Sequence, residues 1–445
     1  MFKSILKSIS QLQRNKVVRN VVLVGGITLF IKGIAFYKET LVAAHFGLSM
    51  ILETFFIAFL IPGFIQNVFI ESFKSVFIPN YVAELHRGKN MASFQATGFL
   101  TTFLISVSFA IIALLFTDVY LEIFFSGHDP EYYKLIKSQF YFLLPCIIIW
   151  GFTSLLSGLL NINEEFKLSS LNGVFFPITT IICLLFFRET FGDQVLAISA
   201  LIGTSIGFLY LLVVCIKKDI LHVAWPDFNN LNIRIMFKQI PAKLASSIFS
   251  GSHTIIEQYF AAQLIIGSIA AINYAQKIPA FAIGILVIAM NTVLLPHFSK
   301  LVITDSRKAF SELFKMLKVV FLGSAIVAIL GIFTSDFFVS FFFERKEFTS
   351  EDSKLVAALQ QIILIYIPFK ISGMLLVNFL TSINKNNYMA IVSFVSLILN
   401  ILLNFILMKY YGIFGIAIST TVVVIIRNII LFIFTLKQKG ISLNS

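Results

Sequence analysis

Residues 20–45 read NVVLVGGITLFIKGIAFYKETLVAAH, an apolar run that nevertheless carries Lys32, Lys38 and Glu39. A helix that spans a membrane needs about 20 mainly apolar residues, so this run predicts a transmembrane helix. An ionised side chain at the bilayer centre costs about 2.5–3.5 kcal/mol. We therefore expect these three side chains to face a water-filled cavity or to pair with one another.

The rest of the chain has the same character. Of its 445 residues 58% are hydrophobic and only 13% are charged. A water-soluble domain needs roughly a quarter of its residues charged, so an ordinary soluble enzyme is excluded. We expect an all-α polytopic membrane protein with about 12 transmembrane helices. These are predicted at residues 20–45, 51–80, 95–117, 137–161, 168–187, 195–216, 236–266, 268–296, 316–340, 355–382, 388–408 and 412–436.

The net charge of +12 is informative because of where the basic residues lie. Lys and Arg concentrate in alternate connections, and the positive-inside rule then predicts that both termini are cytoplasmic. The protein is expected in the cell (inner or plasma) membrane. The first 19 residues predict a basic amphipathic segment on the inner surface. The three cysteines all lie in apolar stretches and are expected to be buried hydrophobes, so we expect no metal site and no cofactor.

An internal repeat suggests two lobes. Each copy holds, in the same order, a glutamate, an Ala-Ala pair and two prolines. The first copy contains Glu39, Ala43, Ala44, Pro62 and Pro79, and the second contains Glu257, Ala261, Ala262, Pro279 and Pro296. Six spans per copy give both copies the same membrane orientation, which predicts two six-helix lobes related by a pseudo-two-fold axis around a central cavity. The predicted lobes are 20–216 and 235–436, joined by a cytoplasmic linker at 217–234 and followed by a cytoplasmic tail at 437–445.

Three lysines within the spans are candidates for an anion site. Lys32 and Lys38 lie in the first span and Lys277 in the eighth, and the repeat predicts that both spans line the cavity. Lysine binds phosphate oxygens as a point charge. A cationic cavity in an otherwise apolar protein suits an amphiphile with a phosphate head. Acidic residues lie in the same spans, and Glu39, Glu53 and Glu257 are candidates for an ion or proton role.

Several motifs resemble those of the MurJ-type lipid II flippases. IKGIAFYKE at 31–39 resembles that family's S-R-x-x-G-x-x-R-D, and LETFFIAFLIP at 52–62 resembles its A-D-A-F-F-x-A-F-x-x-P. NYAQK at 273–277 and VLLP at 293–296 resemble its Y-Y-A-D-R and I-L-L-P. The resemblance implies the fold of the multidrug/oligosaccharidyl-lipid/polysaccharide exporter superfamily. It also implies a charged cavity formed by Lys32, Lys38, Glu39, Glu53, Glu71 and Lys277.

The family pattern is altered at several of these positions. Lysine stands at 32, 38 and 277 where the family has arginine, which keeps the charge but loses the bidentate fork. A family arginine falls at Gln66 or Asn67, and the family's acid before Lys277 is Gln276. We therefore expect Gln66, Asn67 and Gln276 to bind substrate beside the lysines, and Glu71 and Glu257 to join the acids of the cavity.

The function expected from these observations is that of a flippase. It would translocate a polyprenyl-diphosphate-linked saccharide, lipid II or a related cell-envelope precursor, from the inner to the outer leaflet by alternating access. Its partners would be that cargo, membrane lipids and a coupling ion (H⁺ or Na⁺), with no nucleic acid and no enzymatic reaction. One alternative is a drug or cation antiporter of the same superfamily, whose cationic cargo would favour an acidic cavity. Another is a membrane-embedded sugar polymerase or ligase, which would need a larger outer loop.

Overall fold

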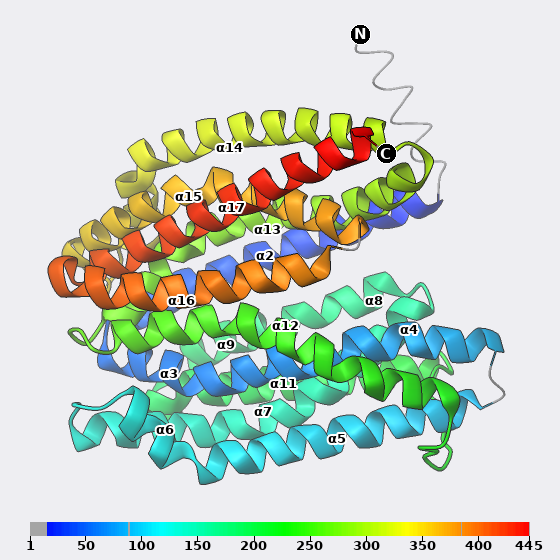
Figure 1. Ribbon diagram of the computed structural model, residues 1–445. Coiled ribbons are helices and arrows are strands. Elements are labelled where there is room, and N and C mark those ends of the chain that lie inside the picture. Colours follow the sequence, from blue (N-terminus) through cyan, green and yellow to red (C-terminus); the bar gives the residue numbers. More distant parts are fainter. Residues whose placement is uncertain (1–15, 88–89, 384, 445) are drawn as a thin grey trace, which may run out of the picture. The chain divides into compact units, whose positions relative to one another are not determined.

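The structure is a computed structural model that describes residues 16–87, 90–383 and 385–444. These residues form helices and no β-strand (Figure 1), which confirms the expected all-α class. Helices satisfy every backbone hydrogen bond within one segment, as hydrocarbon surroundings require. The long helices are α2 Lys16–Phe46, α3 Met50–Ile65, α4 Glu71–Arg87, α5 Met91–Leu115, α7 Pro130–Ile162, α9 Phe175–Phe186, α11 Val195–Lys217, α12 Leu231–Ala261, α13 Ser268–Thr304, α14 Ser306–Phe343, α15 Ser350–Ser382, α16 Asn386–Tyr411 and α17 Ile413–Asn444. Shorter helices are α6 Thr117–Phe124, α8 Phe166–Leu171 and α10 Arg188–Phe191, with 3-10 turns at Asn172–Val174 and Gly192–Gln194.

Each of the twelve predicted spans overlaps a helical stretch of the structure. Within the described residues, nine helical stretches are long and apolar enough to cross a membrane. Helices α2, α12 and α13 add 31, 31 and 37 residues. At 1.5 Å per residue they are about 46–56 Å long, which exceeds the ~30 Å hydrocarbon core. Of the predicted basic segment 1–19, residues 16–19 begin α2 and the others lie outside the described residues.

Many helices extend beyond the apolar runs that predicted them. Helix α14 begins at Ser306 rather than 316, where the Asp305 carboxylate accepts a hydrogen bond from the backbone N–H of Lys308 at 2.8 Å. Helix α15 begins with a capping box in which Thr349 and Asp352 bond each other's backbone N–H groups. Polar caps of this kind set where a helix starts, and hydropathy does not report them.

The chain divides into two compact units. Unit 1 comprises the residues up to Leu41, Ile57–Ile123 and His128–Ile248, and unit 2 comprises Val42–Phe56, Phe124–Gly127 and Phe249–Ser445. The connection between α11 and α12 covers residues 218–230, within the predicted linker 217–234. The lobe boundaries derived from the sequence stay a prediction.

The order of burial along the chain repeats between the units. Helix α7, the fourth span, and α15, the tenth, each have 61% of their most apolar stretch buried. The third and ninth spans, α5 and α14, are the least buried at 22% and 11%. The sixth and twelfth, α11 and α17, both have 39% buried. These three pairs of spans are therefore similar in burial, whereas the six-helix repeat itself stays a prediction.

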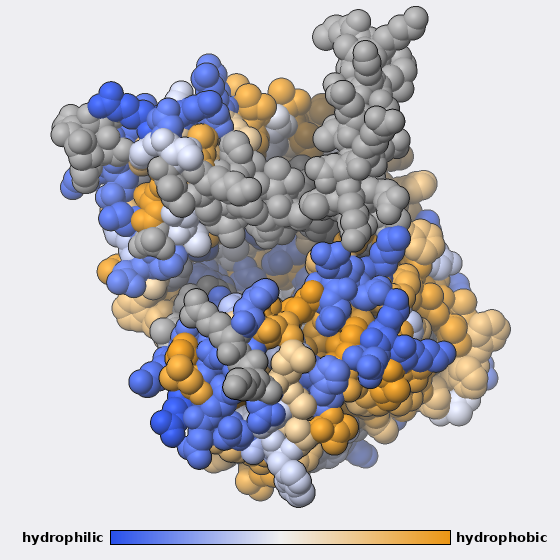
Figure 2. All heavy atoms as spheres, turned by 90° about the vertical axis from the view of Figure 1, so that its right-hand side faces the viewer, coloured by the Kyte–Doolittle hydropathy of each residue, from blue (hydrophilic) through white to orange (hydrophobic). Residues whose placement is uncertain are grey.

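Unit 1 packs around an aromatic core. The rings of Phe77 and Tyr81 stack with centroids 5.7 Å apart, and Phe94 of α5 lies 5.5 Å from Phe77. Gly98 of α5 permits this packing, because a Cβ there would lie 2.2 Å from the Phe77 ring. Figure 2 looks onto one end of the helices, where hydrophilic residues gather in clusters with hydrophobic residues between and beside them.

Candidate functional site

Helix α2 carries the first three charged residues of the predicted site. The Lys38 ammonium lies 2.6 Å from a carboxylate oxygen of Glu39, and both side chains are largely buried, at 13% and 15% exposed. The same ammonium lies 5.1 Å from the ring centroid of Phe176 in α9, a favourable cation–π distance. Lys32 is half-buried two turns earlier. The Lys38 charge is thus held by one neighbouring acid and one aromatic ring.

A π-helical turn at Gln66–Ile70 interrupts the second span between α3 and α4. It follows Pro62, which lies inside α3 and has no backbone N–H to donate. Insertions of this kind are frequent at functional sites. Its first two residues are Gln66 and Asn67, both predicted to bind substrate. The π-turn therefore sets the direction in which these two side chains leave the helix.

Gln66 and Asn67 line a cavity of about 270 Å³ within unit 1. Its other walls are Phe59, Gly63, Trp150, Phe176 and Thr204. In the described part of the chain the Gln66 side-chain oxygen is buried and accepts no hydrogen bond. Phe176 both lines this cavity and lies 5.1 Å from the Lys38 ammonium, so one ring connects the lysine of α2 with the cavity of the π-turn amides.

Glu71 lies one turn beyond these amides, in α4. One of its carboxylate oxygens accepts a hydrogen bond from the Ser154 hydroxyl of α7 at 3.0 Å. The other lies 3.4 Å from the Lys74 ammonium, an i,i+3 neighbour on the same helix. These partners tie Glu71 to both α4 and α7.

Unit 2 holds a second polar cluster around Glu257 of α12. Its carboxylate accepts a short hydrogen bond from the Thr420 hydroxyl of α17 and a longer one, 3.4 Å, from the Gln276 amide of α13. Glu257 and Gln276 were predicted site residues. Thr420 was not predicted. The sequence does not show whether the hydroxyl of a threonine in an apolar helix bonds to its own helix backbone or to a side chain on another helix.

Two lysines of unit 2 are held over aromatic rings. The Lys277 ammonium lies 5.8 Å from the Phe56 ring centroid, and that of Lys370 lies 5.3 Å from the Tyr366 centroid. Lys370 is not among the predicted site residues. Its side chain is exposed on α15, so unit 2 presents a second cation that the motif comparison does not contain.

Glu53 forms the N-terminal cap of α13. One carboxylate oxygen accepts hydrogen bonds from the backbone N–H groups of Gly267 and Ile269 at 2.6 and 3.1 Å, and Glu53 is 1% exposed. A carboxylate at a helix N-terminus satisfies unpaired donors and interacts favourably with the helix dipole. Lys277 lies in the same helix, so Glu53 helps to position it; a part as a cavity acid stays a prediction.

The predicted site residues thus fall into two sets, one in each unit. Unit 1 holds Lys32, Lys38, Glu39, Gln66, Asn67 and Glu71, and unit 2 holds Glu53, Glu257, Gln276 and Lys277. Each set contains a lysine over an aromatic ring, a carboxylate and at least one side-chain amide. These are groups that can bind an anionic head group and hydrogen-bond its sugar.

Known proteins share this fold and sequence. A solved structure described as lipid II flippase MurJ in an inward closed conformation superimposes with a TM-score of 0.81 at 23% identity, covering 94% of this chain and 87% of that one. An inward-facing multidrug resistance MATE family transporter of the MOP superfamily gives 0.74 at 12% identity, with 94% and 98% coverage. These likenesses establish the fold of a multi-span membrane transporter.

Sequence comparison identifies the family. A protein of Buchnera aphidicola subsp. Schizaphis graminum, described as a probable lipid II flippase MurJ, is 26% identical over 439 residues, covering 96% of this chain and 84% of that protein. The family profile described as lipid II flippase MurJ matches residues 42–445. Because that match covers most of the sequence, the chain belongs to the lipid II flippase MurJ family.

Proposed function

We propose that this protein is a flippase that moves a polyprenyl-diphosphate-linked saccharide, lipid II or a related cell-envelope precursor, from the inner to the outer leaflet. The observation that carries the proposal is the site around Lys38, where the aromatic ring beside a membrane-embedded ammonium, that of Phe176, also lines the cavity of Gln66 and Asn67. Membership of a family whose members are described as lipid II flippases supports it. The protein changes the location of its cargo and makes or breaks no covalent bond.

Lys38 in unit 1 and Lys277 in unit 2 can each bind phosphate oxygens of the cargo as a point charge. The Glu39 carboxylate, 2.6 Å from the Lys38 ammonium, compensates that charge while no cargo is bound, because an uncompensated charge in the membrane is costly. Diphosphate then competes with Glu39 for Lys38. Gln66, Asn67 and Gln276 donate hydrogen bonds to the head group, and Lys32 adds positive charge on the same face of α2 as Glu39.

In the proposed alternating access, the two lobes expose these residues first to the cytoplasm and then to the outer face. The acidic residues, above all Glu39 and Glu257, couple this movement to H⁺ or Na⁺. Glu257 already has two donors on different helices, Thr420 and Gln276, so a change in its charge alters how three helices are held together. The excess of Lys and Arg in alternate connections supports cytoplasmic placement of both termini in the inner membrane.

An antiporter of cationic drugs shares the fold, since a MATE family transporter superimposes on this chain. The side chains disfavour that function here. Such a cargo needs an acidic site, whereas Lys32, Lys38 and Lys277 are predicted site residues and Glu39 already has a cationic partner. An anionic head group is the better electrostatic match.

The test is transport in proteoliposomes that contain a fluorescent polyprenyl-diphosphate-linked saccharide, with the fraction reaching the outer leaflet measured by a membrane-impermeant quencher. A charge-assisted contact is worth about 1.5–3 kcal/mol, so Lys38→Ala and Lys277→Ala should each slow transport by about ten- to hundredfold. Lys38→Arg, which keeps the charge, should retain most of the rate. Lys217→Ala, at an exposed position at the end of α11, is the control. Equal rates for wild type, Lys38→Ala and Lys277→Ala would refute the assigned site.

A further inference from the structure

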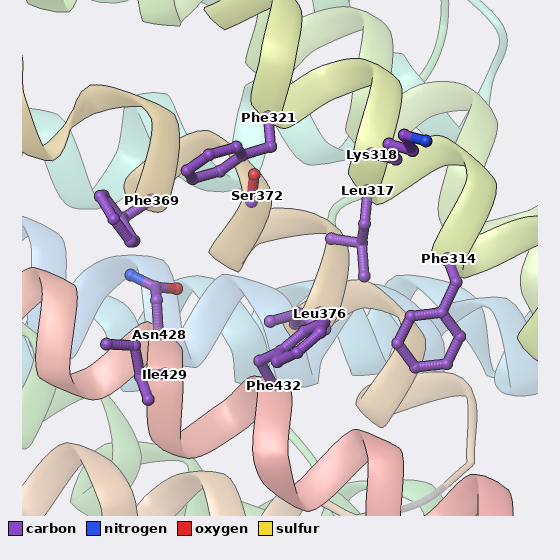
Figure 3. A pocket seen from close by; sticks show the side chains of 10 residues that line it. All are labelled: Phe314, Leu317, Lys318, Phe321, Phe369, Ser372, Leu376, Asn428, Ile429 and Phe432. Carbon is purple, nitrogen blue, oxygen red and sulfur yellow. The ribbon is translucent and has the colours of Figure 1, made fainter. Parts of the chain in front are cut away.

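Unit 2 contains a second cavity, of about 330 Å³, between α14, α15 and α17 (Figure 3). This volume lies within the roughly 300–1,000 Å³ typical of ligand sites. Aromatic and aliphatic side chains form most of the wall. The lining residues are Phe314, Leu317, Lys318, Phe321, Phe369, Ser372, Leu376, Asn428, Ile429 and Phe432. None of these is a predicted site residue, and none is acidic.

Two pairs of rings frame the apolar part of this cavity. Phe314 meets Phe432 edge-to-face at 5.8 Å, and Phe321 meets Phe369 in the same way at 5.2 Å. Ile429 and Phe432 are 45% and 39% exposed on the side of α17. In a membrane-spanning helix an exposed apolar flank faces hydrocarbon, so the cavity is open to lipid chains rather than to water.

One end of the cavity is basic. Lys318 of α14 lines it, and the Lys439 ammonium of α17 lies 5.1 Å from the centroid of Phe314, itself a lining residue. Exposed Lys315 and Lys437 lie on the same two helix ends. This is the end that the distribution of basic residues assigns to the cytoplasm. Basic side chains at that level attract the anionic lipids of the inner leaflet.

Two uncharged hydrogen-bonding side chains line the cavity, Ser372 and Asn428, and the Asn428 amide already donates to the Val424 carbonyl at 2.7 Å. Ser372 of α15 is 8% exposed, and within the described residues its hydroxyl has no hydrogen-bond partner. In Figure 3 its oxygen lies among the lining side chains, near Phe321. A buried hydroxyl left unpaired in an apolar site costs free energy, which an acceptor on a bound ligand would recover. The ester carbonyls of a glycerophospholipid lie just below the phosphate, at the corresponding depth.

We propose that this cavity binds an acidic glycerophospholipid of the inner leaflet, with an acyl chain between α14, α15 and α17, the phosphate on Lys318 and Lys439, and an ester carbonyl accepting from Ser372. Its lining includes none of the residues assigned to the Lys38 and Lys277 sites, and the proposal does not involve cargo transport. Binding is therefore measured without cargo, and the result does not depend on the proposed flippase activity.

The experiment uses the full chain in phosphatidylcholine nanodiscs doped with phosphatidylglycerol that carries a photoreactive acyl chain. We expect crosslinks that map to α14, α15 and α17, and preferential retention of phosphatidylglycerol over phosphatidylcholine by native mass spectrometry. Lys318→Gln combined with Lys439→Gln should weaken retention about 25-fold, since each basic residue near an anionic surface contributes about fivefold. Ile429→Trp, at a half-exposed position, should exclude the chain and abolish the crosslinks while both lysines remain.

The matched control is Lys354→Gln combined with Lys409→Gln. It removes two exposed lysines, one at the start of α15 and one at the end of α16, that do not line the cavity. It should bind phosphatidylglycerol as the wild type does. Equal retention of both phospholipids, or unchanged retention by the Lys318/Lys439 double variant, would overturn the proposal. Displacement of phosphatidylglycerol by a stoichiometric polyprenyl phosphate would also overturn it, by assigning the cavity to an isoprenoid chain instead.

Discussion

The contact between Glu53 and the start of α13 gives a sharp test of how this fold holds its predicted site residues. Replacing Glu53 by alanine removes the single carboxylate oxygen that accepts from the N–H groups of Gly267 and Ile269. At 1% exposure no water readily takes its place. Each buried donor left unsatisfied costs about 1–3 kcal/mol, so Glu53→Ala should destabilise unit 2 by about 2–6 kcal/mol.

Glu53→Gln separates hydrogen bonding from charge. The amide oxygen still accepts from the backbone, but the favourable interaction of a carboxylate with the helix dipole, up to ~2 kcal/mol, is lost. We therefore expect an intermediate loss of about 1–2 kcal/mol for this variant. The order of stability should be wild type, then Glu53→Gln, then Glu53→Ala.

The assay exploits the native cysteines. Cys146, Cys183 and Cys215 are free and buried, so a fluorogenic maleimide labels them as the protein opens, and the labelling midpoint is followed against temperature in detergent. Because all three cysteines lie in unit 1, their labelling detects the unfolding of unit 2 only if unit 1 unfolds as well. Tryptic cleavage within α13 is therefore the direct readout of unfolding in unit 2. Glu189→Gln, which neutralises an exposed acid of α10, is the control. If Glu53→Ala matches the control in both readouts, the contact does not stabilise α13.

Further predictions concern packing and the Glu257 cluster. Gly98→Ala places a Cβ 2.2 Å from the Phe77 ring and should destabilise unit 1 by about 1–3 kcal/mol in the same labelling assay, whereas Gly323→Ala, which meets nothing within 4 Å, should be neutral or stabilising. Thr420→Val removes the hydroxyl that donates to Glu257 and should lower transport about tenfold, with recovery in Thr420→Ser. Thr334→Val, which removes a half-buried hydroxyl that donates to the Leu330 carbonyl within α14, is the control and should transport normally. Gln66→Leu leaves an apolar group in the cavity of the π-turn, and should reduce transport without altering the labelling midpoint; an altered midpoint would assign Gln66 a structural part instead.

The apolar runs by themselves determined that this is an all-helical membrane protein with about twelve spans. Hydrocarbon permits few backbone arrangements, so length and hydropathy decide the class. The same reasoning selected Lys38, Glu39 and Glu257, because a charge within a span is costly wherever it lies. Glu71 was indicated by the family resemblance instead.

The tertiary structure alone decided which groups these charges meet. Thr420 bonds Glu257 from 163 positions away, and the Phe176 ring lies beneath Lys38 from a different helix. Nothing in the sequence indicates the π-turn at Gln66 or the contact of Glu53 with the start of α13. An apolar sequence on all sides of a helix shows that the helix is surrounded by lipid or protein. It does not show which face packs against which neighbouring helix. That choice comes from the packing of whole helices against one another.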